Sequence, residues 1–418
     1  MKVSILPVYH NTPEYRLPIY SFILYQEYII TTSAYGVQVY NRSVLNPNNN
    51  AHENKSEIHQ QIKLPGHILT SAIHKNTLYV AGDTATIYIF IFNGSTKMFD
   101  DVGSVKNDTL DITKVYIYNN LLISGGLDGI LNVFTINNTN LYLKKKVNIN
   151  EIITQTRNKA NSGLVDENII YGLISFNGNL CVLTVNNIFV FNSNIELLKS
   201  AGTMFEGSTS SELYFTKPAN INDQYLICGL GNRNGACSVE ILDRDLERGM
   251  CLMGHARPTE VIAASLPLKL IKNDTPEADI EETVSEIDKS LIIDDSESKP
   301  VEKQTKQKIL TEILIATSSQ DKSLVIWSNK RCVPLMVFKN FSTLPVMHME
   351  FVGNILYIAT YDGYLKRILF DEFEDTEKTL KADTGFVSNQ IPAWRKFEMP
   401  KKQKSETQIK KEAQRVEM

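Results

Sequence analysis

One short pattern repeats along most of this sequence: a turn of small or polar residues leads into a strand that ends at an aromatic or aliphatic residue. The clearest copy runs from Ser319 through Asp321 to Trp327. Seven copies can be placed, and they end at Tyr40, Phe90, Phe134, Phe191, Ile241, Trp327 and Ile368. A single unit of this kind cannot bury its hydrophobic face alone, so neighbouring units must stack on one another to build a core.

The spacing of the copies identifies the architecture. Successive ends lie 50, 44, 57, 50, 86 and 41 residues apart, and the long interval shortens to 50 when residues 273–308 are left out. Short runs rich in Ile, Val, Tyr and Phe fill each interval, with almost no helical periodicity before residue 270. Units of about 40 to 50 residues with four short strands are typical of WD-repeat β-propellers. We therefore expect an all-β, seven-bladed WD-repeat β-propeller.

Charge is distributed unevenly although the formal net charge is only −4. The stretch from Asp274 to Glu297 holds ten acidic residues and one basic residue, and the stretch from Arg395 to Arg415 holds eight basic and three acidic residues. Such segments bury too little apolar surface to offset the entropy lost on ordering. The sequence thus predicts a propeller over residues 1–370 with a disordered acidic insertion at 273–308. A polar linker and a basic partner-binding tail follow over 371–418.

The N-terminal run of residues 2–8 alternates as a strand does and has no partner of its own. An open propeller would expose two sheet edges, which favours aggregation. We expect this run to supply the outer strand of the last blade, whose other strands lie between Val346 and Phe370.

Three residue types typical of a WD blade occur together in the sixth unit. Gly254-His255 precedes its first strand, Asp321 lies in a tight turn, and Trp327 ends the repeat. We expect His255, Asp321 and Trp327 to form a buried structural network in which each polar group has a partner. The alternative, an acid/base pair of His255 and Asp321, lacks a neighbouring nucleophile. A second pair, Gly66-His67, is expected to open the unit that ends at Phe134, or the loop before it.

No catalytic or cofactor motif is found. The sequence has no phosphate-binding loop, no G-x-S-x-G and no H-E-x-x-H, and its five cysteines match neither a disulfide framework nor a zinc pattern. It also lacks an apolar run long enough to cross a membrane, and a signal peptide. We expect a protein without enzymatic activity, without a cofactor or metal and without membrane contact, which acts as a binding platform.

Several segments, in order, resemble the HIRA/Hir family of histone chaperone subunits. The most specific is LMGHARPTEVI from Leu252 to Ile262, which resembles the family's V-G-H-x-x-P-T-E-V. The other matching segments lie at residues 1–7, 18–21, 232–244, 319–335 and 362–372. Residues 263–267 depart from the family, because they replace its F-N-P. The WD-repeat middle subunit of chromatin assembly factor has similar repeat ends, and it remains an alternative.

The resemblance implies a nuclear subunit for nucleosome assembly outside replication and for transcription regulation, including repression. It implies core histones, the anti-silencing-function histone chaperone and other subunits of a HIR-type complex as partners, with DNA contacted only indirectly through chromatin. Family members carry a basic segment after the propeller that adds a strand to the anti-silencing chaperone. Residues 406–416 resemble this segment, with Gln414 in place of a basic residue. The implied contact residues are Ile409, Lys410, Lys411, Arg415 and Val416.

Two other interpretations remain open. The tail can equally be a solvated basic segment or a weak nuclear-import signal. The propeller can also be a scaffold that activates a catalytic partner such as a methyltransferase.

Overall fold

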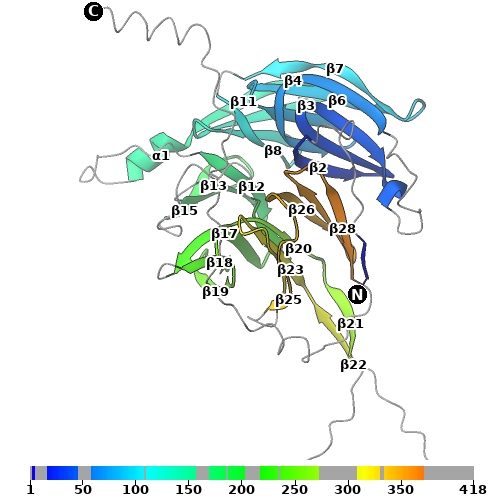
Figure 1. Cartoon of the computed structure of the whole chain (residues 1–418). Coiled ribbons are helices and arrows are strands. Elements are labelled where there is room, and N and C mark those ends of the chain that lie inside the picture. Colours follow the sequence, from blue (N-terminus) through cyan, green and yellow to red (C-terminus); the bar gives the residue numbers. More distant parts are fainter. Residues whose placement is uncertain are drawn as a thin grey trace, which may run out of the picture. The chain divides into compact units, whose positions relative to one another are not determined.

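The computed structural model describes residues 2–4, 17–45, 58–107, 110–156, 169–184, 187–202, 217–233, 236–272, 308–329 and 334–370 (Figure 1). The chain divides into two compact units, Met1–Thr376 and Glu377–Met418, and all described residues belong to the first. This part is almost entirely β-structure, which confirms the predicted class. The exceptions are the helix α1 (Ile149–Thr156) and the short 3-10 turn η1 (Arg42–Leu45).

Five antiparallel sheets have four strands each. The first contains β8 (Ile112–Tyr118), β9 (Leu121–Gly126), β10 (Ile130–Asn137) and β11 (Asn140–Asn148). The second contains β12 (Ile170–Phe176), β13 (Asn179–Thr184), β14 (Asn187–Phe191) and β15 (Leu197–Gly202). The third contains β16 (Ala219–Ile221), β17 (Tyr225–Arg233), β18 (Ala236–Leu242) and β19 (Arg248–Met253). The fourth contains β20 (Thr259–Ala264), β23 (Leu314–Ser319), β24 (Leu324–Ser328) and β25 (Pro334–Phe338). The fifth contains β26 (Val346–Val352), β27 (Ile355–Thr360), β28 (Leu365–Leu369) and β1 (Lys2–Ser4).

A sixth sheet has six strands and includes two unusually long ones. Its members are β2 (Ile19–Tyr25), β3 (Tyr28–Asn41), β4 (Ile58–His74), β5 (Thr77–Gly82), β6 (Thr86–Asn93) and β7 (Met98–Lys106). The first half of β3 pairs with β2 and its second half with β4. The second half of β4, from Ile68 onward, pairs with β5. A side chain at Gly36 would collide with the Ile62 carbonyl oxygen, 2.0 Å from the position of a Cβ, so glycine permits this close pairing.

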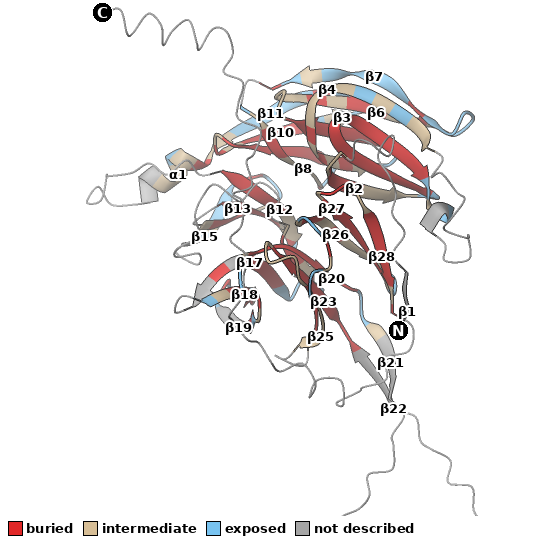
Figure 2. Ribbon diagram, in the orientation of Figure 1, coloured by how far each residue is buried: buried red, intermediate tan, exposed pale blue. Residues whose placement is uncertain are grey.

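The sheets follow one another in chain order and form a propeller-like ring. Its innermost strands are β2, the second half of β4, β8, β12, β16, β20 and β26, which we call the inner strands. Each inner strand contacts the next, and β26 contacts β2 to complete the circuit (Figure 1). In contrast, β7 at the far end of its sheet is largely exposed (Figure 2).

Hydrophobic packing joins each group of strands to the next. The described residues contain seven buried clusters, and each combines side chains from at least two successive groups. The cluster that completes the circuit places Phe22 and Tyr40 against Tyr357 and Leu365. Burial of this apolar surface is the main stabilising contribution, at roughly 25 cal/mol per Å².

The seven residues that end the predicted repeat are all buried, and each lies in the strand third from the centre or, for Tyr40, in the second half of β3. The repeat thus marks one recurrent position. Six inner strands also share a register shift near their start, where one extra residue interrupts the pairing. The pattern read from the sequence therefore corresponds to a recurrent local geometry as well as to recurrent strands.

β1 lies at the outer edge of the fifth sheet, as expected. Lys2 pairs with Leu369 and Ser4 with Arg367 in antiparallel register. The prediction of a closing strand is confirmed for these residues, whereas residues 5–8 lie outside the described part.

One element near the acidic insertion was not expected from the sequence. β21 (Leu268–Lys272) and β22 (Lys308–Glu312) form a separate two-stranded hairpin. Lys308, predicted to lie in the disordered insertion, is part of a strand. Residues 273–307 lie outside the described part.

Candidate functional site

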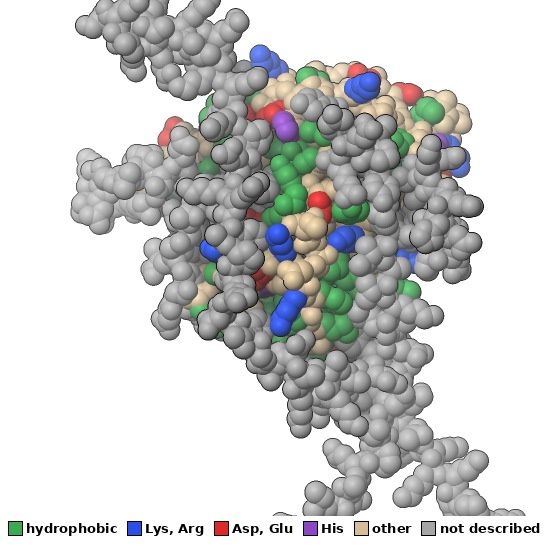
Figure 3. Space-filling view, in the orientation of Figure 1, with side chains coloured by type: hydrophobic (Ala, Val, Ile, Leu, Met, Phe, Trp, Pro, Cys, Tyr) green, Lys and Arg blue, Asp and Glu red, His purple; other side chains and the backbone are tan. Residues whose placement is uncertain are grey.

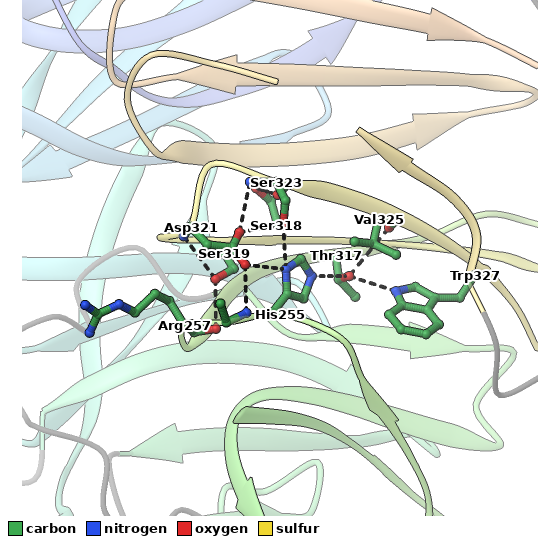
Figure 4. A network of polar contacts seen from close by, with 10 residues as sticks. His255, Arg257, Thr317, Ser318, Ser319, Asp321, Ser323, Val325 and Trp327 are labelled. Atoms are coloured by element: carbon green, nitrogen blue, oxygen red, sulfur yellow. Dashed lines mark hydrogen bonds and ion pairs between the residues drawn. The ribbon is translucent and has the colours of Figure 1, made fainter. Parts of the chain in front are cut away.

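The structure brings His255, Asp321 and Trp327 into one chain of contacts (Figure 4). His255 lies in the segment before β20, and Asp321 lies in the turn between β23 and β24. Nδ1 of His255 is 3.3 Å from Oδ2 of Asp321 and 2.9 Å from Oγ of Ser323. Its Nε2 is 2.8 Å from Oγ1 of Thr317. Trp327 does not contact the imidazole, because its indole N–H donates instead to Oγ1 of Thr317, at 2.8 Å.

The contacts form one connected network of donors and acceptors. The Trp327 N–H donates to the Thr317 hydroxyl, which itself donates to the Val325 carbonyl oxygen. The imidazole of His255 lies between Thr317 at Nε2 and the pair Ser323 and Asp321 at Nδ1. The Ser323 hydroxyl donates in turn to Oδ1 of Asp321. Each of these buried polar groups thus has a partner, which avoids a cost of about 1 to 3 kcal/mol for an unsatisfied group. The sequence did not identify Thr317 and Ser323, although Ser323 lies within the clearest copy of the repeat and Thr317 lies two residues before it.

The environment of Asp321 stabilises its charged form. Burial raises the pKa of this carboxyl, but the hydrogen bond and charge of His255, together with hydrogen bonds from Ser323, outweigh it and lower the pKa to about 2. An ionised carboxylate also suits its other contact, the backbone N–H of Ala256 at 2.9 Å.

The geometry of the network does not provide a nucleophile for a substrate. Thr317 occupies Nε2 of His255, and both Thr317 and Trp327 are fully buried. Asp321 and Ser323 share the opposite nitrogen, whereas a catalytic triad places the carboxylate and the nucleophile on different nitrogens.

The contact between Asp321 and a backbone N–H recurs in three other sheets. A carboxylate in the turn between the second and third strands accepts the backbone N–H of the segment that leads into the first strand. These pairs are Asp83 with His67, Asp128 with Leu110, Asp321 with Ala256, and Asp362 with Thr343, at 2.9 to 3.3 Å. The recurrent polar group of this ring is therefore an aspartate that holds a backbone segment.

The Gly66-His67 pair differs from its expected role. His67 lies in β4 directly before the part that pairs with β5, so it belongs with the strands that end at Phe90 and not with the unit ending at Phe134. Its Nδ1 is 2.7 Å from the hydroxyl of Tyr20 on β2. The expectation that this pair opens the unit ending at Phe134 was wrong, because the strands that follow it directly are the second part of β4, β5 and β6, and β6 contains Phe90.

The structure describes the cysteines but not the predicted partner-binding residues. The predicted partner-binding residues Ile409, Lys410, Lys411, Arg415 and Val416 lie outside the described part of the chain. Cys181, Cys228, Cys237 and Cys251 are free thiols, and burial raises the pKa of Cys181 to about 12. The described ranges contain no group of three or more His, Cys, Asp or Glu side chains placed to hold a metal ion. No helix within them is both long and apolar enough to span a bilayer.

The fold and this network define a β-propeller-like protein with a WD-type polar network in one of its sheets. The comparisons then connect it to particular proteins. It is 25% identical to Protein HIR1 of Eremothecium gossypii over 173 residues and 27% identical to Protein HIR1 of Kluyveromyces lactis over 175 residues. The chain is thus a distant relative of HIR1, as its sequence motifs suggested.

The extent of this similarity is limited. Each alignment covers 41% of this chain but only 20% and 18% of the two relatives. No protein-family model matches the chain. Among solved structures, the crystal structure of the computationally designed Ika8 protein matches 84% of this chain and 83% of its own, with a TM-score of 0.50 and 13% identity. That last likeness concerns the fold alone.

Proposed function

We propose that this chain is a non-enzymatic subunit of a HIR-type histone chaperone that acts in nucleosome assembly outside replication and in transcription regulation. The observation that carries the proposal is the distant homology to HIR1 in a chain that folds as a ring of β-sheets. The buried network supports a non-catalytic role, since its polar groups stabilise the fold and present no reactive atom. Fold alone would not specify this function.

The proposal includes a seven-bladed propeller. In the six-stranded sheet, Oγ1 of Thr31 donates to the carbonyl oxygen of Gln38 within β3, which fits a strand that folds back on itself. Because β4 likewise pairs with different partners along its length, this sheet can be divided into two blades of four strands. Seven inner strands and seven hydrophobic clusters support the same count.

The proposed partners are core histones, the anti-silencing chaperone and other HIR-type subunits, in the nucleus. Purification of the tagged chain from its own cells, followed by mass spectrometry, tests this assignment. We expect core histones and the anti-silencing chaperone to copurify. Copurification of an RNA-modifying catalytic subunit in their place would instead support a scaffold that activates an enzyme.

Partner binding through residues 409–416 is a separate part of the proposal. An extended segment can add to the edge of a sheet, where main-chain hydrogen bonds supply affinity and alternate side chains supply specificity. A peptide of residues 401–418 should bind the anti-silencing chaperone in a salt-sensitive manner. Arg415→Ala and Val416→Ala together should weaken binding by about 30-fold, which corresponds to about 2 kcal/mol.

The matched control for this peptide is Lys402→Ala, which removes a basic residue outside the motif. It should bind as the unmodified peptide does. Equal affinity for all the peptides would reject the assignment of these residues and leave the propeller unaffected.

A further inference from the structure

Three basic side chains meet at the centre of the ring. Lys114 is on β8 and His348 is on β26, and each follows the register shift at the start of its inner strand. Lys217 lies directly before β16, where its N–H donates to the Glu260 carbonyl oxygen at 2.9 Å and its own carbonyl accepts from Ile262 at 3.1 Å. The three residues are far apart in sequence but lie at the same end of the inner strands, and each remains partly exposed to solvent.

Two of these groups present hydrogen-bond donors to each other. The backbone N–H of Phe22 donates to Nδ1 of His348 at 3.0 Å, so a neutral imidazole carries its hydrogen on Nε2. That Nε2 faces Nζ of Lys217, which also donates to the Met349 carbonyl oxygen at 2.9 Å. When Lys217 is charged, its ammonium and this N–H cannot satisfy one another, because neither offers a lone pair.

The positive charge of the lysines at the centre of the ring is balanced by few negative groups. Lys114 forms no hydrogen bond or ion pair with any residue in the described part of the chain. Burial, and then the charge of Lys217, lower the pKa of Lys114 to about 7. Burial and the two lysines hold the pKa of His348 well below its usual range. Burial also lowers the pKa of Lys217, and Glu350 is the carboxylate that opposes this effect.

We propose that the centre of the ring binds an oxyanion between Lys114, Lys217 and His348. An oxygen atom placed there accepts hydrogen bonds from Nζ of Lys217 and from Nε2–H of His348 at once. Its negative charge also stabilises the ammonium of Lys114, and charge-assisted hydrogen bonds are stronger than neutral ones. The ligand is a phosphate or a carboxylate, either free or at the end of a larger molecule.

This inference goes beyond the proposed function and does not depend on it. The site is basic and would repel histone tails, so it fits a different, acidic ligand. Basic and hydrophobic side chains also gather over the middle of the face shown in Figure 3.

Calorimetric titration of the full chain with inorganic phosphate, and separately with acetate, tests the site. We expect binding at pH 7.5. For acetate, which is fully ionised at this pH, binding should be accompanied by uptake of a fraction of a proton, because a bound anion raises the pKa of Lys114. Titration in two buffers with different ionisation enthalpies measures this uptake. Binding of phosphate alone identifies a phosphate ligand, whereas binding of acetate as well identifies a carboxylate of the kind found on acidic peptides.

Lys114→Met and Lys217→Met should each weaken binding at least tenfold. Both variants should melt at the same or a higher temperature, because each removes a charge whose burial is unfavourable. Lys146→Met, at an exposed position on β11, is the control and should bind as the unmodified chain does. Absence of binding to both anions, or equal binding by all variants, would overturn the proposal.

Discussion

An aspartate in the turn between the second and third strands of a sheet can hold a backbone segment that is far away in sequence. Its carboxylate oxygen accepts the N–H of that segment. Asp83, Asp128, Asp321 and Asp362 all do so. Asp83, Asp128 and Asp362 each stand beside a glycine or threonine in the sequence, but the sequence does not show which backbone N–H groups they bind. Backbone N–H groups carry no sequence signal, which explains why the recurrent partner was missed.

The lowered pKa of Asp321 predicts how stability depends on pH. Since the folded-state pKa of about 2 lies below the ordinary value of 3.8, the ionised carboxylate stabilises the fold above about pH 4. This contribution, about 2 kcal/mol, is lost as the pH falls from 4 to 2. Urea unfolding at several pH values should show the loss in the unmodified chain. Asp321→Asn should be less stable at neutral pH, and the difference should disappear at pH 2.

Thr317 should be as important to the network as His255. Thr317→Val keeps the shape of the side chain but leaves the Trp327 N–H and Nε2 of His255 without their partner. We expect the free energy of unfolding to fall by about 1 to 3 kcal/mol. Denaturant unfolding measures it, with Thr135→Val on the exposed face of β10 as the control, which should change stability by less than about 0.5 kcal/mol. A Thr317→Val variant as stable as this control would contradict the proposed structural role.

Among the elements, strands of the ring could be predicted and the added hairpin could not. Periodic apolar runs and their turns locate the strands, because burial of alternate side chains requires that pattern. β21 and β22 flank the acidic stretch, and their sequences LKLIK and KILTE mix apolar and charged residues over only five positions each. A pattern this short does not predict that two segments so far apart in sequence will pair, and a two-stranded hairpin buries little surface. The two strands pair from Leu268 with Glu312 to Lys272 with Lys308. This pairing depends on the folded chain and not on a local sequence pattern.

The hairpin should be dispensable for folding, because β20 pairs directly with β23 and not with β21 or β22. We expect replacement of residues 269–311 by Asn-Gly to change the melting temperature by only a few degrees. Glu312 is kept in this variant because its carboxylate accepts a hydrogen bond from Ser328. Thermal unfolding followed by circular dichroism gives the measurement, and a variant that no longer folds would show that the hairpin belongs to the core.

For the whole molecule, the decisive contact joins the two ends of the ring. The sequence predicted it because an unpartnered N-terminal strand and a last unit lacking an outer strand complement each other. It could not predict the centre, where Lys114, Lys217 and His348 meet, because their proximity arises from the circuit of inner strands and leaves no local pattern.

Removal of residues 1–4 should expose the outer edge of β28. We expect the unfolding free energy to fall by about 1 to 3 kcal/mol through lost ladder hydrogen bonds, and the protein to self-associate through the free edge. Thermal unfolding and size-exclusion chromatography measure the two effects. Deletion of residues 415–418 serves as the control and should alter neither. A truncated chain that stays monomeric and equally stable would show that β1 does not secure the ring.

The pairing of β1 with β28 joins the first and the last described strands to be synthesised. The ribosome makes Ser4 roughly 360 residues before its partner Arg367. At about 5 to 20 residues per second, the first strand waits for about 20 to 70 s before its partner exists. Throughout that interval β1 has no pairing partner and the growing chain is an open series of sheets. We therefore expect a nascent chain of this protein to need protection from aggregation until its last sheet has emerged.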